Sequence, residues 1–192
     1  MKNIAIFASG SGSNAEEIMK HFQRHPHAQV ALVISNNASA YVLERAKKFH
    51  IKSLIFSRQK LVETSLVDEV LKTHHIDFIV LAGFMLLFPV RLIRKFPDKI
   101  LNIHPALLPK YGGKGMYGMH VHQAVVDNRE NETGITIHMV NEKYDEGRII
   151  FQATCAVDPS DTPDDVAKKV HQLEYAHYPV VIEGEIKKLI ST

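Results

Sequence analysis

An amide and an imidazole lie two residues apart in the segment Leu101-Asn102-Ile103-His104-Pro105. Alternate side chains of a strand share one face, so a strand here would project Asn102 and His104 together. Pro105 would then turn the chain out of the sheet. An amide donor beside an imidazole suits an oxygen that gains negative charge during a reaction. The residues alone leave two possibilities open, an oxyanion-binding pair or a structural histidine.

An acidic turn, Tyr144-Asp145-Glu146-Gly147, follows later in the chain. A carboxylate near a histidine raises the pKa of the imidazole and keeps it protonated as a donor or acid. Taken by itself, Asp145 is better explained as a residue that shapes the turn with Gly147. Spacing alone therefore does not establish Asp145 as the partner of His104.

A glycine-rich segment, Ser9–Ala15, joins the first predicted strand to the first predicted helix. Glycines let the backbone approach a ligand, and free amides at the start of a helix bind anions. The pattern also fits a loose dinucleotide fingerprint, but Ser35–Asn37 offer no acid for a ribose where that fingerprint requires one. We therefore expect a phosphate site here, with a purely structural tight turn as the alternative.

The elements that must position these residues follow from the apolar pattern. In the first half, short apolar runs alternate with amphipathic stretches, which predicts parallel strands with helices on both faces. Expected strands cover residues 4–8, 30–34, 53–56, 78–81 and 100–103, and expected helices cover residues 13–23, 41–49 and 61–71. Asn102 and His104 thus fall at the carboxyl end of a strand, where open α/β sheets bind ligands.

The second half of the chain changes character. Two neighbouring extended runs, residues 134–140 and 148–157, predict a more antiparallel or mixed edge of the sheet. Thr162-Pro163-Asp164 predicts the start of a final helix. Threonine is a good N-cap, proline fits the first helical position, and acids suit the positive end of the helix dipole.

The bulk composition is typical of a soluble globular protein, and 192 residues are enough for one domain with a substantial core. Lysine and arginine number 23 against 21 aspartates and glutamates, so a net charge of +2 is too small to indicate nucleic acid as the main partner. The first apolar run breaks at Ser9-Gly10, too early for a signal peptide or a membrane-spanning helix. We expect a cytoplasmic protein with no membrane partner.

One cysteine and 12 histidines raise the questions of redox and metal chemistry. Cys155 cannot form an internal disulfide, which favours a reducing compartment, and its apolar neighbours favour an inert, packed thiol. His74-His75 and His120-x-His122 lack a cysteine or carboxylate cluster at ligand spacing. We therefore predict no metal site; His120 and His122 could instead approach the reaction site from the end of a loop.

Five segments resemble the folate-dependent formyltransferases, in the same order and over about residues 2–185: Ser9–Asn14, Ser35–Asn37, Leu81–Met85, Leu101–Lys110 and Tyr144–Gly147. The run Leu-Ala-Gly-Phe-Met together with Asn-Ile-His-Pro-Ala-Leu-Leu-Pro is specific to this family. The glycine-serine segment and the single-domain length favour its glycinamide ribonucleotide branch. The resemblance implies a single-domain, three-layer α/β/α fold with a mostly parallel central sheet, the Rossmann-like formyltransferase fold. It also implies a phosphate-binding half, residues 1–100, and a catalytic and folate-binding half, residues 101–192.

The resemblance further implies transfer of the formyl group of 10-formyltetrahydrofolate to the amine of 5'-phosphoribosylglycinamide, a step of purine biosynthesis. Both are small-molecule substrates, the folate is a co-substrate, and neither a metal nor nucleic acid takes part. The neutral amine would attack the formyl carbon, and Asn102 with protonated His104 would hold the resulting oxyanion. Asp145 would raise the pKa of His104 and organise the water that carries a proton to the departing folate nitrogen. The protein is expected to be a monomer or a homodimer.

Further roles are carried over to matching positions by the same resemblance. Gly12, Ser13 and Asn14 would hold the phosphate and ribose of the substrate. Glu174 would contact the substrate amine, with a solvated helix acid as the alternative. The folate pocket would be lined by Arg58, Met85, Leu86, Leu87, Phe88, Asn102 and Tyr144.

Two segments depart from the family pattern. Leu86 stands where relatives can carry a basic residue, which predicts a more apolar pterin side of the pocket. The segment Tyr111–Met119 is longer and richer in glycine than its short form in some relatives. It directly follows the Asn-x-His-Pro turn, so we predict a mobile loop that closes over the substrate.

Other functions remain open at this point. A formyltransferase acting on methionyl-tRNA or a sugar nucleotide is the nearest, although the tRNA enzymes carry an additional C-terminal domain and a folate hydrolase would carry a regulatory one. A nucleotide-binding module without transferase chemistry, or a nicotinamide enzyme, belongs to a different class. A passive binder would leave Asn102 and His104 without a role.

Overall fold

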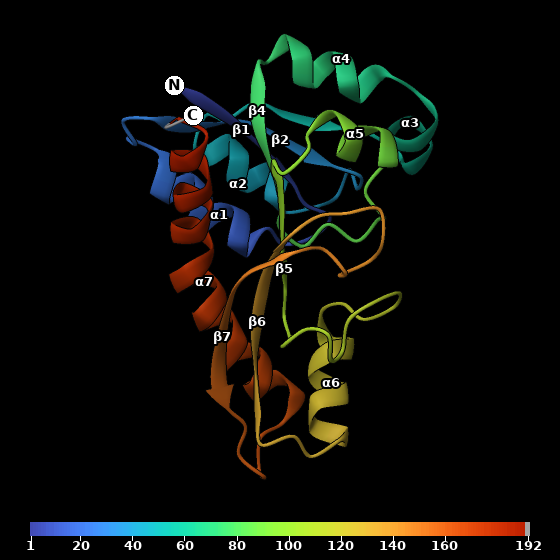
Figure 1. Ribbon diagram of the computed structural model, residues 1–192, viewed down its shortest axis with the longest axis vertical. Coiled ribbons are helices and arrows are strands. Elements are labelled where there is room, and N and C mark those ends of the chain that lie inside the picture. Colours follow the sequence, from blue (N-terminus) through green and yellow to red (C-terminus); the bar gives the residue numbers. More distant parts are fainter. Residues whose placement is uncertain (191–192) are drawn as a thin grey trace. The chain divides into compact units, whose positions relative to one another are not determined.

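The computed structural model describes residues 1–190, and the strands in this part of the chain form one sheet (Figure 1). The strands are β1 (Lys2–Phe7), β2 (Ala28–Ser35), β3 (Ser53–Ile55), β4 (Ile76–Leu81), β5 (Ile100–His104), β6 (Glu132–Met139) and β7 (Ile149–Ala156). Their order in the sheet is β3-β2-β1-β4-β5-β6-β7. β1 pairs parallel with β2 and β4, β2 pairs parallel with β3, and β6 pairs antiparallel with β7. The predicted mostly parallel sheet with an antiparallel edge is confirmed.

The described helices are α1 (Ser13–Phe22), α2 (Val42–Lys48), α3 (Arg58–Glu63), α4 (Leu66–Thr73), α5 (Val90–Lys95), α6 (Met119–Asp127) and α7 (Pro163–Lys188). The helix predicted over residues 61–71 is wrong in its continuity, because α3 and α4 are separate. Thr64 has an extended backbone, and its hydroxyl donates to the Lys60 carbonyl at 2.6 Å. Such side-chain bonds compete with the helical ladder. The short helices α5 and α6 were not predicted.

The chain divides into two compact units. Unit 1 contains Met1–Leu101 and the chain from Ile182 onward, and unit 2 contains Asn102–Val181. The expected single domain, with functional halves at residues 1–100 and 101–192, remains a prediction.

The core of unit 1 is built on strands buried on both faces. In β1, all side chains from Ile4 to Phe7 are fully buried. A continuous apolar run of this kind is what a parallel strand inside an α/β protein requires. Phe7 packs edge-to-face against Phe84 and Phe88, with ring centroids 5.6 and 5.0 Å away. This aromatic cluster anchors the segment that follows β4.

Unit 2 is organised around β6 and residues 163–181 of the long helix α7. β6 is buried along nearly its whole length, including the polar residues Thr136 and His138. α7 begins as predicted: the Thr162 hydroxyl accepts from the Asp165 N–H at 3.3 Å, and the Asp165 carboxylate accepts from the Thr162 N–H at 3.2 Å. This reciprocal capping box satisfies amides that have no partner inside the helix.

Candidate active site

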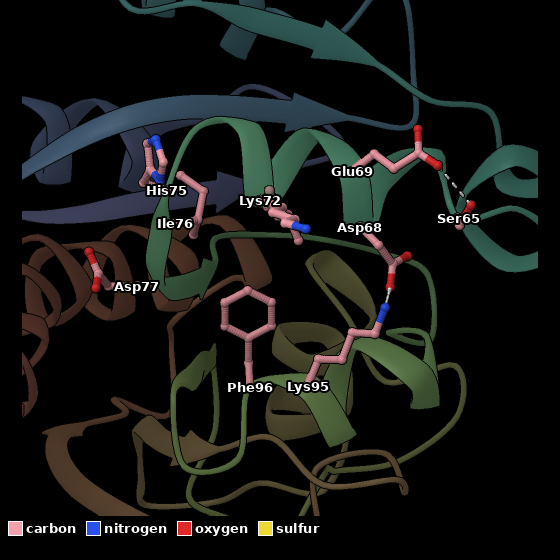
Figure 2. A pocket seen from close by; sticks show the side chains of 10 residues that line it. Ser65, Asp68, Glu69, Lys72, His75, Ile76, Asp77, Lys95 and Phe96 are labelled. Carbon is pink, nitrogen blue, oxygen red and sulfur yellow. Dashed lines mark hydrogen bonds and ion pairs between the residues drawn. The ribbon is translucent and has the colours of Figure 1, made fainter.

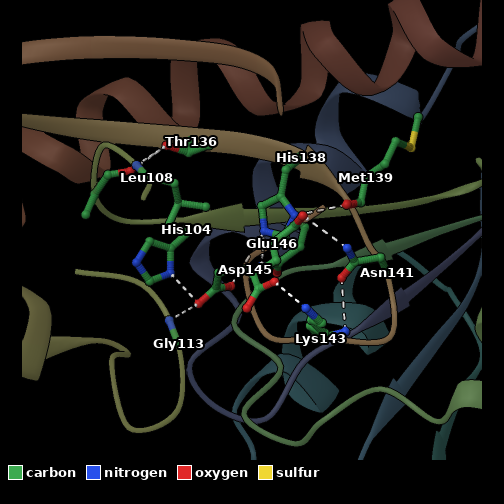
Figure 3. A network of polar contacts seen from close by, with 12 residues as sticks. His104, Leu108, Gly113, Thr136, His138, Met139, Asn141, Lys143, Asp145 and Glu146 are labelled. Atoms are coloured by element: carbon green, nitrogen blue, oxygen red, sulfur yellow. Dashed lines mark hydrogen bonds and ion pairs between the residues drawn. The ribbon is translucent and has the colours of Figure 1, made fainter. Parts of the chain in front are cut away.

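Four side chains of unit 2 form a connected polar network at the end of β5. Figure 3 labels three of them, His104, His138 and Asp145. The Asp145 carboxylate lies 3.5 Å from Nδ1 of His104 through Oδ2, and 3.6 Å from Nε2 of His138 through Oδ1. Nδ2 of Asn102 lies 3.1 Å from the same Nε2 of His138. The structure thus brings the three residues predicted to be catalytic into one network and adds His138.

The imidazole of His104 is buried, at 4% exposure, and both of its nitrogens face acceptors. Nε2 donates to the backbone carbonyl of Tyr111 at 2.7 Å, and Nδ1 faces Asp145. Burial lowers the pKa of His104 more strongly than Asp145 and the Tyr111 carbonyl raise it, and the charge of His138 lowers it further. The sequence-based expectation of a raised pKa is therefore wrong in its net direction. The contribution of Asp145 has the expected sign, but desolvation of the imidazolium is larger.

Asp145 is held in place by the turn between β6 and β7. Its backbone is left-handed, with φ of 53°, and its Oδ2 accepts from the Gly113 N–H at 2.9 Å. Asn141 braces the turn by donating to the Glu146 carbonyl at 3.0 Å. Gly147 permits the fold of the turn, because a Cβ there would lie 1.6 Å from the Met139 carbonyl oxygen.

The pKa of Asp145 reflects the same surroundings. Burial alone would raise the pKa of this carboxyl. A protonated His138, the charge of His104 and the Gly113 N–H together hold the pKa below its ordinary value. Asp145 is therefore a carboxylate across the neutral range and supplies a fixed negative charge beside His104.

His138 is the member of the network that the sequence did not reveal. Its Nδ1 lies 3.0 Å from the Met139 carbonyl, which can only accept, so Nδ1 carries the hydrogen in the neutral ring. Nε2 then accepts from the Asn102 amide, which turns the NH2 group of Asn102 toward it. The only signal was a pair of polar residues, Thr136 and His138, at alternate positions of a strand buried on both faces.

Thr136 supports the turn that follows Asn102 and His104. Its hydroxyl donates to the Ala106 carbonyl at 2.7 Å and accepts from the Leu108 N–H at 2.9 Å. Gln152 of β7 donates to the same hydroxyl at 2.9 Å and to the Leu108 carbonyl at 3.1 Å. These hydrogen bonds fix the backbone of residues 106–108, immediately after Asn102 and His104.

A second histidine of unit 2 lies within electrostatic reach of His104. His122 on α6 is buried at 2% exposure, and burial first, then the charges of His171 and His104, lower its pKa to about 4. His122 therefore approaches the network as anticipated, whereas His120 is exposed. On α7, the buried Glu174 lies 4.0 Å from Nε2 of His171. The alternative of a solvated helix acid is thus wrong for Glu174.

The glycine-rich segment of unit 1 leads from β1 into α1. Gly12, rather than Ser13 or Asn14, is the N-cap, and no side chain caps the helix. Gly12 has φ of 72°, and a Cβ there would lie 2.5 Å from the Cβ of Val42. Both facts require glycine. The helix therefore begins without a side-chain cap, and Ser13 and Asn14 are its first two residues.

Side chains around this segment hold its shape. Ser9 donates from its hydroxyl to Oδ1 of Asn36 at 2.6 Å and accepts from the Met85 N–H at 2.9 Å. Arg45 donates from Nε to the Ser11 carbonyl at 2.9 Å. Because Ser9 bonds to Met85, the predicted phosphate segment and the start of the predicted folate segment are joined within unit 1.

The predicted folate-lining residues differ in exposure. Met85 and Leu87 are 54% and 42% exposed, Leu86 is half-buried, and Arg58 is exposed at the start of α3. Phe88 is buried in the aromatic cluster with Phe7, so its ring packs in the core instead of presenting a surface. In unit 2, Tyr144 is 39% exposed.

A cavity of unit 1 lies elsewhere, among α4, α5 and the start of β4 (Figure 2). It holds about 600 Å³, and no predicted site residue lines it. Asp68 on its wall is already paired with Arg91 at 2.8 Å and Lys95 at 2.5 Å.

Other predicted features are less informative. Cys155 is half-buried on β7, and burial raises the pKa of its thiol, which reduces its nucleophilicity. Within residues 1–190, no three His, Cys, Asp or Glu side chains are grouped so as to hold a metal ion, and no described helix is long and apolar enough to cross a membrane. The closing motion of Tyr111–Met119 remains a prediction.

The chain belongs to the formyl transferase family, whose model matches residues 2–182. It is 42% identical to the chloroplastic phosphoribosylglycinamide formyltransferase of Arabidopsis thaliana, over 94% of this chain and 64% of the relative. It is 39% identical to the phosphoribosylglycinamide formyltransferase of Haemophilus influenzae, over 95% of this chain and 86% of the relative. The chain spans 64% and 60% of the two plant relatives, less than two thirds of their lengths.

Solved structures carry the same name. The phosphoribosylglycinamide formyltransferase of Streptococcus pneumoniae superposes with a TM-score of 0.84 at 35% identity, covering 96% of this chain and 98% of that one. The corresponding protein of Anaplasma phagocytophilum gives a TM-score of 0.86 at 31% identity, covering 94% and 84%. The formyltransferase fold expected from the sequence is confirmed.

Proposed function

We propose that the protein transfers the formyl group of 10-formyltetrahydrofolate, a folate-type donor as its family implies, to the amine of 5'-phosphoribosylglycinamide. The observation that carries this proposal is the polar network that joins buried His104 and His138 to half-buried Asn102 and Asp145. It offers two donors and a carboxylate for the formyl oxygen and the amine. The names of the Haemophilus influenzae and Streptococcus pneumoniae relatives support the choice of substrate.

Asn102 and His104 act on the formyl oxygen. As the neutral amine attacks the formyl carbon, the carbon–oxygen double bond opens and the oxygen gains negative charge. His138 already turns the Asn102 NH2 group, and its second hydrogen is available to that oxygen. Nδ1 of His104 supplies the second donor once it is protonated, because Nε2 is bonded to Tyr111.

The lowered pKa of His104 determines at which point of the reaction Nδ1 becomes protonated and can donate. Burial disfavours the imidazolium, so Nδ1 takes up a proton from the solvent as negative charge gathers beside it, and returns that proton to the solvent when the oxyanion collapses. Asp145, 3.5 Å away, stabilises the imidazolium that results. The new carbon–nitrogen bond forms, the bond to the folate nitrogen breaks, and the proton released by the amine passes to that departing nitrogen through water organised by Asp145.

The remaining predicted residues bind the two substrates. Gly12, Ser13 and Asn14 offer the amides at the start of α1 to the phosphate, because the first amides of a helix have no intrahelical acceptor. Glu174, buried on α7, contacts the substrate amine. The folate is bound by Met85, Leu86, Leu87, Arg58 and Tyr144, with Phe88 supporting them from the core.

The setting of the protein is part of the same proposal. We infer small-molecule substrates and a cytoplasmic monomer or homodimer, supported by the weak net charge of +2 and the single cysteine. The chloroplastic name of the Arabidopsis relative makes the compartment a point to test, by fractionating the source cells.

A direct assay tests the proposal. Purified protein is mixed with 10-formyltetrahydrofolate and 5'-phosphoribosylglycinamide, and deformylated folate is followed. His104→Ala should lower kcat about a hundredfold or more, whereas His120→Ala, a change of an exposed histidine, should not. Turnover with methionyl-tRNA or a sugar nucleotide in place of this amine would overturn the substrate. Full activity of His104→Ala would overturn the mechanism.

A further inference from the structure

The bond between Nε2 of His104 and the Tyr111 carbonyl decides which nitrogen of His104 can gain or lose a proton. A carbonyl can only accept, so Nε2 keeps its hydrogen as long as the 2.7 Å bond is present. Nδ1 is then the titrating atom, and it faces Asp145. Asp145 by itself would favour the opposite neutral tautomer, with the hydrogen on Nδ1, so the Tyr111 carbonyl must be held firmly.

The backbone of Tyr111 is in a conformation that it would not adopt unaided. Its φ is 55°, in the left-handed region, where a residue other than glycine is disfavoured. Such a conformation persists only where neighbouring contacts determine it. One such contact is made by the side chain of Tyr111 itself.

The Tyr111 hydroxyl donates to Oε1 of Glu130 at 2.8 Å. Glu130 lies between α6 and β6, and its own N–H donates to the Val125 carbonyl at 3.2 Å, which ties it to α6. Lys110 also reaches Glu130, at 3.0 and 3.2 Å, but its side chain is 67% exposed. An exposed ion pair of this kind contributes little, so the phenol–carboxylate bond is the effective anchor.

This anchor is present at every pH at which His104 could act. Burial and Glu130 raise the pKa of Tyr111 to about 12, and Lys110 and Tyr111 hold the pKa of Glu130 below its usual value. The phenol thus keeps its hydrogen and Glu130 keeps its charge while the histidine titrates.

We propose that Glu130 is a positioning residue for His104. Glu130 holds the Tyr111 phenol and, through it, the left-handed backbone of Tyr111. The Tyr111 carbonyl then keeps the hydrogen of His104 on Nε2, which leaves Nδ1 to exchange protons beside Asp145. The kinetic part of this inference rests on the proposed function, whereas the tautomer of His104 does not. The other titratable groups that act on this imidazole are His138 and His122.

The test measures His104 directly, by nitrogen NMR of the full-length protein labelled at histidine, with His104→Gln used to assign its signals. Tyr111→Phe and Glu130→Ala should transfer part of the neutral population to the Nδ1–H tautomer. They should also lower the pKa of His104, because the Tyr111 carbonyl bond that raises it is loosened. Glu130→Gln should restore the wild-type spectrum, since its amide oxygen still accepts from the phenol. Lys110→Met is the matched control and should change nothing.

Steady-state kinetics of the same variants tests the role of Glu130 separately from the proposed formyl transfer. Tyr111→Phe and Glu130→Ala should lower kcat on the order of tenfold, less than the hundredfold that a misplacement of about 1 Å can cost, with KM nearly unchanged. An unaltered His104 tautomer and titration in both variants would overturn the inference, whatever happens to kcat. An altered tautomer in a protein without formyl transfer would uphold the inference and overturn the proposed function.

Discussion

Asp145 and His138 face each other across 3.6 Å, from Oδ1 to Nε2, beneath the turn that joins β6 to β7. The same Nε2 accepts from Asn102, and the other oxygen of Asp145 faces His104. The network therefore links the amide of Asn102 to the imidazole of His104 through the side chains of His138 and Asp145. Replacing any one member should alter the others, so effects on activity should not be additive.

Asp145→Asn should lower the pKa of His104 still further. Asparagine tolerates the left-handed backbone and can accept from the Gly113 N–H, so the change removes mainly the charge. Because the Asp145 charge raises the pKa of His104, its loss moves the titration to lower pH. The pH profile of kcat/KM and nitrogen NMR of His104 measure this. An unchanged pKa would show that the two groups are not coupled.

His138→Phe should reduce kcat by turning Asn102 out of position. Phenylalanine keeps the ring but cannot accept from the Asn102 amide, which is then free to rotate. We expect a loss on the order of tenfold to a hundredfold, near the cost of removing one oxyanion donor. A double-mutant cycle with Asn102→Ala measures it. If His138 acts through Asn102, the double variant should be no slower than Asn102→Ala alone, and additive losses would contradict this.

His122 should make the protein less stable as the pH falls from 6.5 to 4. Its folded-state pKa of about 4 lies below the ordinary value of 6.5, so the unfolded chain takes up the proton first. The free energy of unfolding is unaffected above pH 6.5 and falls by up to about 3 kcal/mol by pH 4.

Urea unfolding of wild type, His122→Leu and His120→Leu between pH 7 and pH 4.5 measures this effect. His122→Leu should flatten the decline, while His104 and His171, whose pKa values are also lowered, keep part of it in all three proteins. The exposed His120 serves as the control. Equal slopes for wild type and His122→Leu would contradict the assignment.

Gly12→Ala should weaken phosphate binding, whereas Gly10→Ala should be tolerated. A Cβ at Gly12 meets Val42 at 2.5 Å in a left-handed backbone, while a Cβ at Gly10 has nothing within 4 Å. We expect a stability loss of about 1–3 kcal/mol for Gly12→Ala, with a higher KM for the phosphate-bearing substrate. Thermal unfolding and steady-state kinetics of the pair provide the comparison. Equal behaviour of the two variants would contradict the role given to this segment.

The parts of the fold that were predictable are those that depend on local pattern. Apolar runs located every strand, and the Thr162 capping box located the start of α7. The break between α3 and α4 was not predictable from apolar spacing, because it depends on the Thr64 hydroxyl competing with the helical ladder. α5, with six residues, is too short for periodicity to identify it, and the buried face of α6 includes His122, which interrupts the apolar spacing.

The candidate site was predictable where residue type and spacing carry chemistry, as for Asn102 and His104. His138 was missed because a polar residue at an alternate strand position ordinarily faces solvent, whereas β6 is buried on both faces. The net direction of the pKa shift of His104 could not be predicted from the sequence either. It depends on the balance between burial and the Asp145 charge, and burial is a property of the folded chain.

Two of the residues with left-handed backbones, Tyr111 and Asp145, deliver acceptors to the same imidazole. Glycine would adopt either backbone without strain, at the loss of the phenol or the carboxylate. Selection for heat resistance alone should therefore enrich glycine at both positions and produce sturdier but slower proteins. Laboratory evolution of this chain toward thermal tolerance needs an activity screen at every round, since two of its six described non-glycine residues with a left-handed backbone lie in the candidate site.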